Sequence, residues 1–397
     1  MRGRLPMSGS QSSLREANRA RVVEAVKRHG GLTQVELTGA TGLSAATVST
    51  IVKELLGAGM VEVRPAVRSG RRAQLVTLAH RVGLVAGVVV GYRQMRVAIA
   101  DVTHEVLAEQ TLPLPAEHRP DTSLDRAALL VVDLLERVGA DLEELVAIGL
   151  GLPTPVDAST GLLSVRGVLR GWDGVPVAQV LEKRLARPVF VDNDANLGAL
   201  AESTVGAARA YHDSLYVRVS HGVGAGVVLG GRVHRGVGGT AGELGHVQVD
   251  PGGRICGCGS RGCLDTVVGV PALLEPLATS HGNLTLRDLV QLAETGDPGC
   301  REIVADAGAT VGAVVANLAT VLSPQCVVVG GELAETGEIF LGPVREAVRR
   351  RTLLSQFVPL EVVSATLGTQ AELMGAILLA LQSTDVFENA DDGRGNQ

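Results

Sequence analysis

The chain has 397 residues, of which 46% are hydrophobic and 20% are charged, and five are cysteines. This length exceeds a single ordinary core and predicts two or three domains. The N-terminus lacks an apolar secretory segment, and no uninterrupted apolar run reaches the roughly 18 residues of a membrane helix. We therefore expect a cytoplasmic protein that makes no membrane contact and keeps its thiols reduced.

Charge is distributed unevenly along the chain. Residues 1–80 carry 12 Lys and Arg against 5 Asp and Glu, a net charge of +7. The remaining residues carry 24 against 37, a net charge of −13. A small basic segment ahead of a large acidic body predicts that the first segment contacts a polyanion and the body does not.

Three short helices are predicted in the basic segment. A capping-box pattern at Ser13 opens the first helix, which Gly30 ends. A second capping box begins at Thr33 and predicts a helix through about Ala40. The third helix follows Ser44 as its cap and ends near Gly57. Its buried stripe is predicted to be Val48, Ile51, Val52 and Leu55.

The third helix and the residues after it have the pattern of a DNA-binding winged helix. Strands are predicted at 60–63 and 74–78, around a basic loop at 64–72. Small residues at the start of the helix fit a major groove about 12 Å wide, and wing arginines suit phosphates or the minor groove. A packing module with solvated arginines is the alternative, but the order of the elements and the charge favour DNA binding. The predicted DNA contacts are Ser44, Ala46, Thr47, Ser49, Thr50, Lys53, Arg68, Arg71 and Arg72.

The body alternates strand-like and helical patterns, which predicts an α/β fold. A long helix is expected at 123–138, and the apolar strand-like runs are 84–90, 95–100, 105–111, 145–151, 189–192 and 326–331. Ligands in such folds bind beyond the carboxyl ends of strands. Asn193 and Asp194 follow one such end, where an amide beside a carboxylate suits a sugar hydroxyl. A helix cap is the alternative for these residues.

Three of the five cysteines lie close together near the middle of the chain. Cys256, Cys258 and Cys263 alternate with glycines, and His246 lies ten residues upstream of the first. Thiolates and an imidazole at this spacing predict a closed Cys3His zinc site that includes His246. Buried free thiols and a disulfide are the alternatives, but neither accounts for the glycines or the nearby histidine.

The segments 191–196, 238–246 and 256–265 together resemble the ROK family, a group of bacterial sugar kinases and sugar-responsive repressors on an actin-like fold. The resemblance extends from about residue 84 to about 382. With the basic segment, it implies a winged helix-turn-helix followed by a two-lobed, actin-like (ribonuclease H-like) ROK body. The expected divisions are a disordered arm at 1–12, the DNA-binding domain at 13–80, lobes at about 81–190 and 191–383, and a disordered tail at 384–397.

The resemblance also implies roles for individual residues. Asp194 matches the general base of the kinases, and Glu243 and His246 match their sugar-contacting segment. His246 would then use one nitrogen for a structural zinc ion and the other for the sugar. Asp265 stands where the family usually has a glutamate, which shortens its reach by one methylene. The expected sugar contacts are Asn193, Asp194, Glu243, His246 and Asp265.

The chain departs from the family pattern where the kinases hold ATP. The first phosphate turn, at 88–94, lacks its aspartate, threonine and paired glycines, and the second, at 220–226, has Ser220 and His221 in place of glycine and threonine. Gly330 and Gly331 still match the adenosine side, and Val168 replaces a usual sugar-facing asparagine. Phosphoryl transfer depends on positioning and neutralising phosphates, so we expect no kinase activity.

These features predict a sugar-responsive transcriptional regulator, most simply a repressor of carbohydrate uptake or catabolism genes. Its expected partners are operator DNA and a small sugar or sugar derivative, and its expected state is a homodimer or homotetramer. The first alternative is an active ATP-dependent sugar kinase with a regulatory DNA-binding domain. The second is a constitutive DNA-binding protein whose body serves only for dimerisation.

Overall fold

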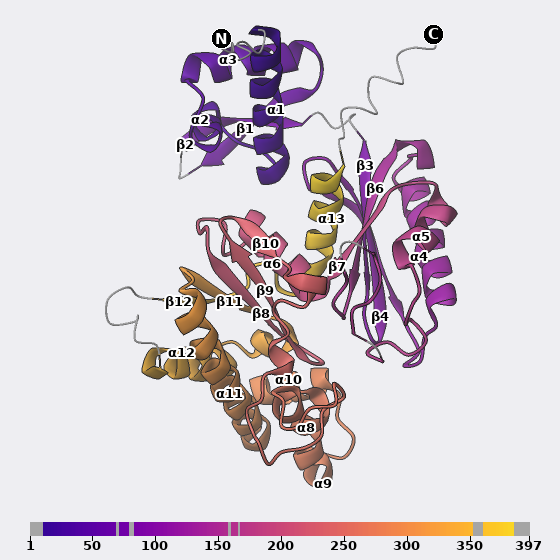
Figure 1. The fold of residues 1–397 in the computed structure, drawn as a ribbon, viewed down its shortest axis with the longest axis vertical. Coiled ribbons are helices and arrows are strands. Elements are labelled where there is room, and N and C mark those ends of the chain that lie inside the picture. The colour runs from indigo at the N-terminus through magenta and orange to yellow at the C-terminus, as the bar shows by residue number, and fades with distance from the viewer. Residues whose placement is uncertain are drawn as a thin grey trace, which may run out of the picture.

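The computed structural model describes residues 11–68, 71–78, 83–157, 160–165, 167–351 and 360–384. A small helical domain with a β-hairpin precedes two lobes, each built on a five-stranded sheet (Figure 1). In both sheets the first three strands are antiparallel neighbours, and two later strands add in parallel beside the first. The two lobes therefore repeat one topology, which confirms the predicted two-lobed α/β architecture.

The N-terminal domain has the predicted order of elements: α1 (Gln11–His29), α2 (Gln34–Thr41), α3 (Ala45–Gly57), β1 (Val61–Arg68) and β2 (Arg71–Leu78). Thr33 and Glu36 form the predicted capping box of α2, and the Ser44 hydroxyl accepts from the Thr47 backbone at the start of α3. Helix α1 begins at Gln11, two residues before the predicted start and within the segment expected to be a disordered arm. The four predicted stripe residues of α3 are all buried.

The wing differs from the prediction in the length of its strands. The pairing of β1 with β2 continues from Val61↔Leu78 out to Arg68↔Arg71, so the predicted nine-residue loop is wrong. Arginine side chains leave the backbone free to pair in a two-stranded ribbon, which is why the basic sequence does not mark a loop. The hairpin tip falls outside the described residues, as do the side chains of the three predicted wing arginines.

The first lobe contains β3 (Leu84–Val90), β4 (Gln94–Asp101), β5 (Val106–Pro113), β6 (Leu145–Leu152), β7 (Val189–Asn193), α4 (Pro120–Arg137) and α5 (Val177–Leu185). All eight residues of β6 are buried, as expected for a parallel strand covered on both faces. The long helix predicted at 123–138 is α4, which begins three residues earlier because Pro120 suits a first helical turn.

The second lobe contains β8 (Ser214–Val219), β9 (Val223–Leu229), β10 (Arg232–His234), β11 (Cys326–Gly330), β12 (Glu361–Ser364), α7 (Asp265–Val268), α8 (Val270–Leu274), α9 (Ala278–His281), α10 (Leu286–Thr295), α11 (Pro298–Leu322) and α12 (Glu338–Arg351). Short 3-10 turns are η2 (Leu142–Glu144), η3 (Val237–Gly239), η4 (Leu244–His246), η5 (Glu275–Leu277), η6 (Glu332–Thr336) and η8 (Gly368–Gln370). Strand β9 begins at Val223, so only the first part of the segment 220–226 is a turn.

Two helices, α6 (Asp194–Thr204) and α13 (Ala371–Ser383), lie between the sheets and pack against each other (Figure 1). Helix α13 packs on β3 and β6 although it comes last in the chain. A Cβ on Gly149 would lie 1.9 Å from the Ala376 carbonyl oxygen, and one on Gly375 would lie 2.0 Å from the Leu197 carbonyl oxygen. Because glycine has no side chain, α13 can pack closely against both β6 and α6 at these two positions.

The predicted division of the lobes at residues 190 and 191 is wrong in two respects. It cuts strand β7, which completes the first sheet at Asn193. It also assigns α13 to the second lobe, whereas this helix covers the first sheet. The chain thus returns to the first lobe at its end, because the apolar face of that sheet still needs a cover.

Helix α11 is long and apolar enough to cross a membrane by length and composition, contrary to the expectation that no segment reaches that length. Half of its most apolar window is buried inside the second lobe. Val304, Val311 and Val315 are each fully inaccessible within the core of that lobe. Packing against the sheet and α12 therefore accounts for its apolar composition.

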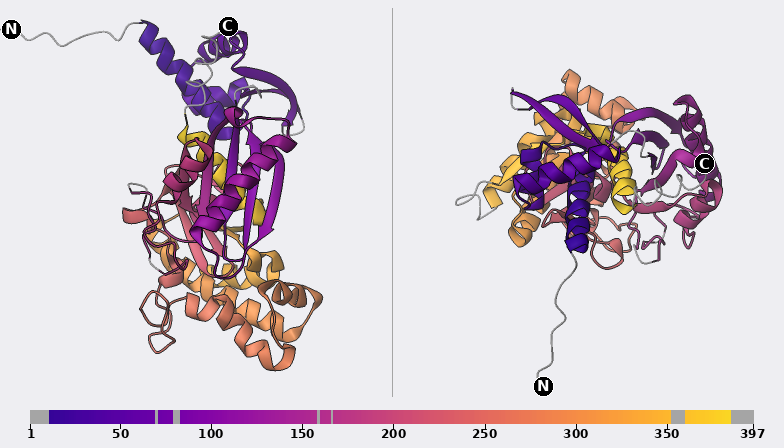
Figure 2. Two further views of the ribbon diagram at one scale, coloured as in Figure 1. Left: turned by 90° about the vertical axis from the view of Figure 1, so that its right-hand side faces the viewer. Right: turned by 90° about the horizontal axis from the view of Figure 1, so that it is seen from above.

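The N-terminal domain sits at one end of the molecule, beside the C-terminal end of α13 (Figures 1 and 2). Val22 and Val26 of α1 share one hydrophobic cluster with Ile377 and Leu381 of α13. The Lys27 ammonium group donates to the Thr384 carbonyl oxygen directly after α13. The two domains are therefore joined by a common core as well as by the chain.

Buried His104 makes a polar contact in the same junction. It lies in the turn between β4 and β5 with a φ of 72°, and its Nε2 donates to the Lys27 carbonyl oxygen at 3.0 Å. Burial lowers the pKa of His104 to about 4 from its ordinary value of 6.5, so the ring is neutral near pH 7. A neutral imidazole satisfies the carbonyl without placing a charge in the junction.

Acid should weaken the protein through His104. Because the folded state lowers its pKa, the contribution to stability is complete above pH 6.5 and is lost as pH falls from 6.5 to about 4. At 1.36 kcal/mol per pKa unit, the full loss is about 3 kcal/mol. Urea unfolding of the wild type and of His104→Asn, which tolerates the positive φ, should show a flatter pH profile in the variant. Identical profiles would contradict this assignment.

Candidate functional site

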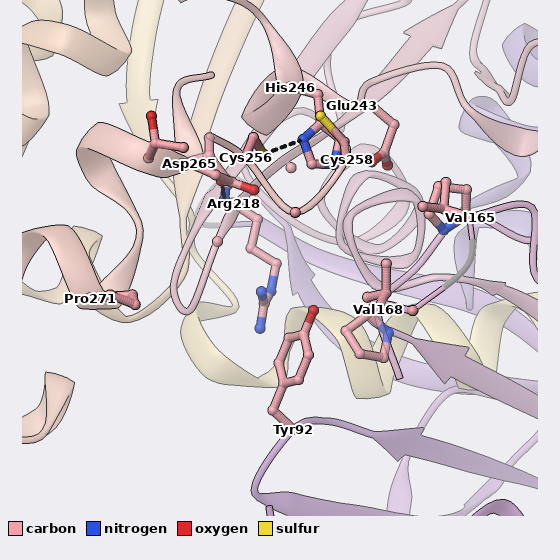
Figure 3. A pocket seen from close by; sticks show the side chains of 18 of the residues that line it. Tyr92, Val165, Val168, Arg218, Glu243, His246, Cys256, Cys258, Asp265 and Pro271 are labelled. Atoms are coloured by element: carbon pink, nitrogen blue, oxygen red, sulfur yellow. Dashed lines mark hydrogen bonds and ion pairs between the residues drawn. The ribbon is translucent and has the colours of Figure 1, made fainter. Parts of the chain in front are cut away.

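A cavity of about 440 Å³ opens between the two lobes (Figure 3). The first lobe contributes an apolar wall that includes Val165 and Val168, together with Tyr92 from the turn between β3 and β4. The second lobe contributes Arg218 from β8 and the residues of the cysteine-rich segment. A wall of apolar groups facing a set of charged groups suits a ligand with C–H faces and hydroxyl edges.

The structure brings all five predicted sugar contacts together along this cavity: Asn193, Asp194, Glu243, His246 and Asp265. They come from the end of β7, the start of α6, the η4 turn and the start of α7. Asn193 and Asp194 lie at the end of a strand of the first lobe, whereas Glu243, His246 and Asp265 belong to the second lobe. The approach of the two lobes therefore brings together residues up to 72 positions apart.

The pair that follows β7 serves two purposes. The Asn193 side-chain oxygen accepts from the backbone of Ala195 at 2.9 Å and of Asn196 at 3.4 Å, so Asn193 is the cap of α6. Asp194 is the first residue of that helix and forms an ion pair with Arg218. Burial raises the pKa of Asp194, although the Arg218 charge opposes the shift. The predicted helix cap is therefore Asn193, while the Asp194 carboxylate lies in the cavity.

The other two carboxylates lie on the second lobe. Burial raises the pKa of Glu243 to about 7, and the charges of Asp194 and Asp265 add to the shift. Asp265 accepts from the Val223 backbone at 2.8 Å through Oδ1, and burial raises its pKa as well. Three carboxylates whose charged forms are penalised gain from hydroxyl donors, which a sugar supplies.

Tyr92 and Arg218 also line the cavity and were not among the predicted contacts, and their side chains point toward each other (Figure 3). Burial and the charge of Asp194 raise the pKa of Tyr92 to about 12. Its ring lies 5.8 Å from that of His221, so the two altered phosphate turns face each other across the lobes. Arg218 interrupts the apolar run 215–219, and an isolated charge in such a run indicates a functional position. The run was not among the predicted strands.

The four predicted metal ligands form one cluster beside the cavity. One ligand atom from each of His246, Cys256, Cys258 and Cys263 lies within 4.8 Å of the others. The Cys256 Sγ is 3.6 Å from His246 Nδ1, and the Sγ atoms of Cys258 and Cys263 are 3.7 Å apart. Tetrahedral ligands at about 2.3 Å from zinc are separated by about 3.7 Å, so the donor set fits this ion. All five cysteines are free thiols in this structure.

The imidazole of His246 is oriented for two contacts. Its Nδ1 faces the thiols, and its Nε2 lies 3.7 Å from Oε2 of Glu243 on the cavity side. A metal-bound histidine commonly donates through its other nitrogen to a carboxylate, which fixes the ring. The cysteine cluster therefore forms one wall of the cavity, with His246 between the thiols and Glu243.

A second grouping of His281, Asp297 and Cys300 has a structural explanation. Asp297 caps α11 by accepting from the Cys300 backbone at 2.9 Å, and its other oxygen lies 3.1 Å from His281 Nε2. The hydrogen bond from the Cys300 backbone and the contact with His281 lower the pKa of Asp297 to about 2. The grouping is a helix cap supported by a histidine.

The predicted DNA-contacting face of α3 is accessible. Ala46, Thr50 and Lys53 are exposed, and Thr47 and Ser49 are half-buried. The Ser44 hydroxyl contacts the Thr47 hydroxyl at 2.8 Å and caps the helix, so its first role is structural. Small side chains around one exposed lysine leave the helix narrow enough for a major groove.

The fold thus defines a winged-helix domain joined to a two-lobed, actin-like body with a cavity between its lobes. Residues 85–383 match the ROK family, and residues 16–72 match the MarR family. The chain belongs to the ROK family.

Relatives and solved structures extend this match. The chain is 26% identical over 393 residues to the xylose repressor of Caldicellulosiruptor bescii, covering 94% of this chain and 97% of the relative. A ROK family transcriptional regulator described as a homologue of the Escherichia coli MLC protein superposes with a TM-score of 0.77 at 25% identity, over 96% of this chain and all of the other. A ROK hexokinase from Thermus thermophilus superposes with a TM-score of 0.64 at 35% identity, over 76% of this chain and 98% of the other.

Proposed function

We propose that the protein is a sugar-responsive transcriptional regulator that represses genes of carbohydrate uptake or catabolism. The observation that carries this proposal is the combination of an accessible α3 with a cavity lined by all five expected sugar contacts. The xylose repressor of Caldicellulosiruptor bescii matches the chain over nearly its full length, N-terminal domain and body together. The match to the ROK hexokinase covers about the length of the body alone.

The effector is proposed to be a small sugar or sugar derivative that contacts Asn193, Asp194, Glu243, His246 and Asp265. Its binding between the lobes changes their relative position and so the DNA affinity. A switch from 1:99 to 99:1 needs sugar binding about 10⁴-fold tighter in the favoured state, or roughly 5.5 kcal/mol. Residues of the two lobes can supply this difference in sugar affinity only if closure of the lobes brings them into contact with the ligand.

A sugar kinase that also regulates is the second candidate, because Asp194 keeps the position of a catalytic base. The Arg218 guanidinium pairs with that carboxylate, 3.4 Å from Oδ2. Tyr92 and His221 belong to the two turns that a kinase uses for phosphates, and their rings face each other there. A Cβ on Gly331 would lie 2.4 Å from the Val219 carbonyl oxygen, so packing explains this glycine without a nucleotide. We therefore propose that the protein is not an enzyme.

The cysteine cluster is proposed to hold a structural zinc ion. Three thiols and one imidazole complete a tetrahedral set, with no position open for substrate or water. The ion would hold the wall of the cavity that carries His246. We further propose that the protein acts in the cytoplasm as a homodimer or homotetramer, since winged-helix regulators read paired half-sites.

A mobility-shift assay with DNA from upstream of the protein's own gene tests the proposal. The panel contains D-xylose, D-glucose and N-acetyl-D-glucosamine, each with and without ATP. One sugar should change the shift without ATP. A shift that no sugar alters would favour the constitutive DNA binder. Turnover of ATP that Asp194→Asn abolishes would favour the kinase.

Replacing Arg71 and Arg72 by alanine should weaken DNA binding on every sequence to a similar degree. Each lost phosphate contact reduces the slope of log K against log salt by about 0.9. Fluorescence anisotropy across a salt series measures both quantities. Lys53→Ala, at the exposed face of α3, is the comparison and should alter sequence preference more than the salt slope. An unchanged slope in the double variant would show that the wing does not contact phosphate.

A further inference from the structure

Arg218 links the ligand cavity to a helix that does not line it. Its guanidinium lies 3.4 Å from Oδ2 of Asp194 in the cavity, and its Nε donates to Oε1 of Glu372 at 2.6 Å. Glu372 is the second residue of α13. One side chain of the second lobe therefore joins the ligand-facing start of α6 to the start of the helix that covers the first lobe.

These three charges are largely removed from solvent. The side chains of Arg218, Asp194 and Glu372 are 23%, 13% and 10% exposed. A buried charge depends on its partners, and removing one partner costs far more than breaking a surface pair. Any ligand group that competes for the Asp194 oxygens therefore changes how firmly Arg218 is held, and with it the pairing to Glu372.

Helix α13 carries this connection to the DNA-binding domain. Its backbone packs directly on the first sheet and on α6 at Gly149 and Gly375, which leaves little room for the helix to bend locally. At its far end, Leu381 lies in the cluster shared with α1, and Thr384 accepts from Lys27. A shift at the start of α13 is therefore expected to reach α1.

A charge outside α13 also acts on the end of α1. Burial lowers the pKa of His29 at the end of α1, and the positive charge of Arg209 adds to the shift. Arg209 belongs to the segment between α6 and β8. The end of α1 therefore carries an electrostatic link to the segment that leads into the second sheet.

We propose that Arg218, Asp194 and Glu372 form a coupling triad that transmits ligand occupancy to the DNA-binding domain through α13. The inference rests on the proposed function. A sugar hydroxyl that donates to Asp194 weakens its pairing with Arg218, and the lobes then shift with α13 relative to the second sheet. Arg218 and Glu372 act as positioning residues in this scheme, and the two-state element is the angle between the lobes.

Glu372→Gln tests the triad because this residue lies outside the cavity. Sugar binding is measured by calorimetry without DNA, and operator affinity by anisotropy with and without D-xylose, D-glucose or N-acetyl-D-glucosamine. In the wild type, the active sugar should change operator affinity by about tenfold or more. In the variant, sugar affinity should stay within about threefold of wild type, while the sugar-dependent change in operator affinity should fall below about threefold.

Arg218→Met and the double variant complete a mutant cycle. If the two residues act through their pairing, the double variant should lose no more coupling than Arg218→Met alone. Glu338→Gln removes the partner of Arg345 in an exposed ion pair on α12 and should leave the coupling unchanged. Should Glu372→Gln fail to fold, Arg218→Lys keeps the charge but loses the two-sided geometry, and should reduce the coupling in the same way.

The outcomes separate the triad from the proposed function. A wild type that responds to a sugar, with Glu372→Gln and Arg218→Lys responding equally well, overturns the triad alone. A wild type whose operator binding no sugar changes overturns the proposed function and the triad with it. Loss of coupling with sugar binding retained supports both.

Discussion

Cys263→Ser should abolish zinc binding and reduce sugar affinity by more than about 100-fold while leaving DNA binding largely intact. Cys263 is fully buried, and its Sγ lies 3.7 Å from that of Cys258. Structural zinc contributes about 10–16 kcal/mol to the folding of small zinc domains, so its loss should release the loop that carries it. Because His246 belongs to the same ligand set, the release would displace Glu243 from the cavity.

The measurements for this variant are the zinc content per chain and the sugar affinity. Wild-type protein should contain one zinc ion per chain, and the variant none. Cys300→Ser is the matched control, because Cys300 is equally buried but lies at the cap of α11. It should keep the zinc and the sugar response. A Cys263→Ser protein with full zinc content would contradict the proposed ligand set.

Gly149→Val should be among the most destabilising single changes in the chain. A Cβ at this position would lie 1.9 Å from the Ala376 carbonyl oxygen and 2.7 Å from its carbonyl carbon, both of which are backbone atoms that cannot rotate away. Helix α13 would have to move off the first sheet. Overpacking of a well-packed core typically costs 1–3 kcal/mol, and a clash with backbone should reach at least about 3 kcal/mol.

Urea unfolding monitored by circular dichroism measures this loss. Gly39→Ala is the control, because no atom lies within 4 Å of a Cβ there and the residue is inside α2. Alanine in a helix should stabilise that variant by up to about 1 kcal/mol. Since α13 also supports α1, Gly149→Val should weaken operator binding before global unfolding. Equal stability of the Gly149→Val protein and the wild type would show that α13 does not pack on the sheet as described.

The local elements of the chain were largely predictable from the sequence alone. The capping patterns at Thr33 and Ser44 and the strand 84–90 depend on residues within a few positions of one another. The same holds for the cysteine-rich segment, where glycines and ligands are neighbours in sequence. Family resemblance then supplied the five sugar contacts, which the structure brings to one cavity.

The tertiary structure alone decided how these parts are connected. The Arg218 side chain meets Glu372 across 154 residues, and no local pattern encodes such a pairing. The return of α13 to the first lobe likewise depends on which apolar face remains uncovered once the sheets have formed. Local periodicity reports how a segment folds. The choice of its distant partners depends on the burial of complementary surfaces and charges, which exists only in the assembled fold.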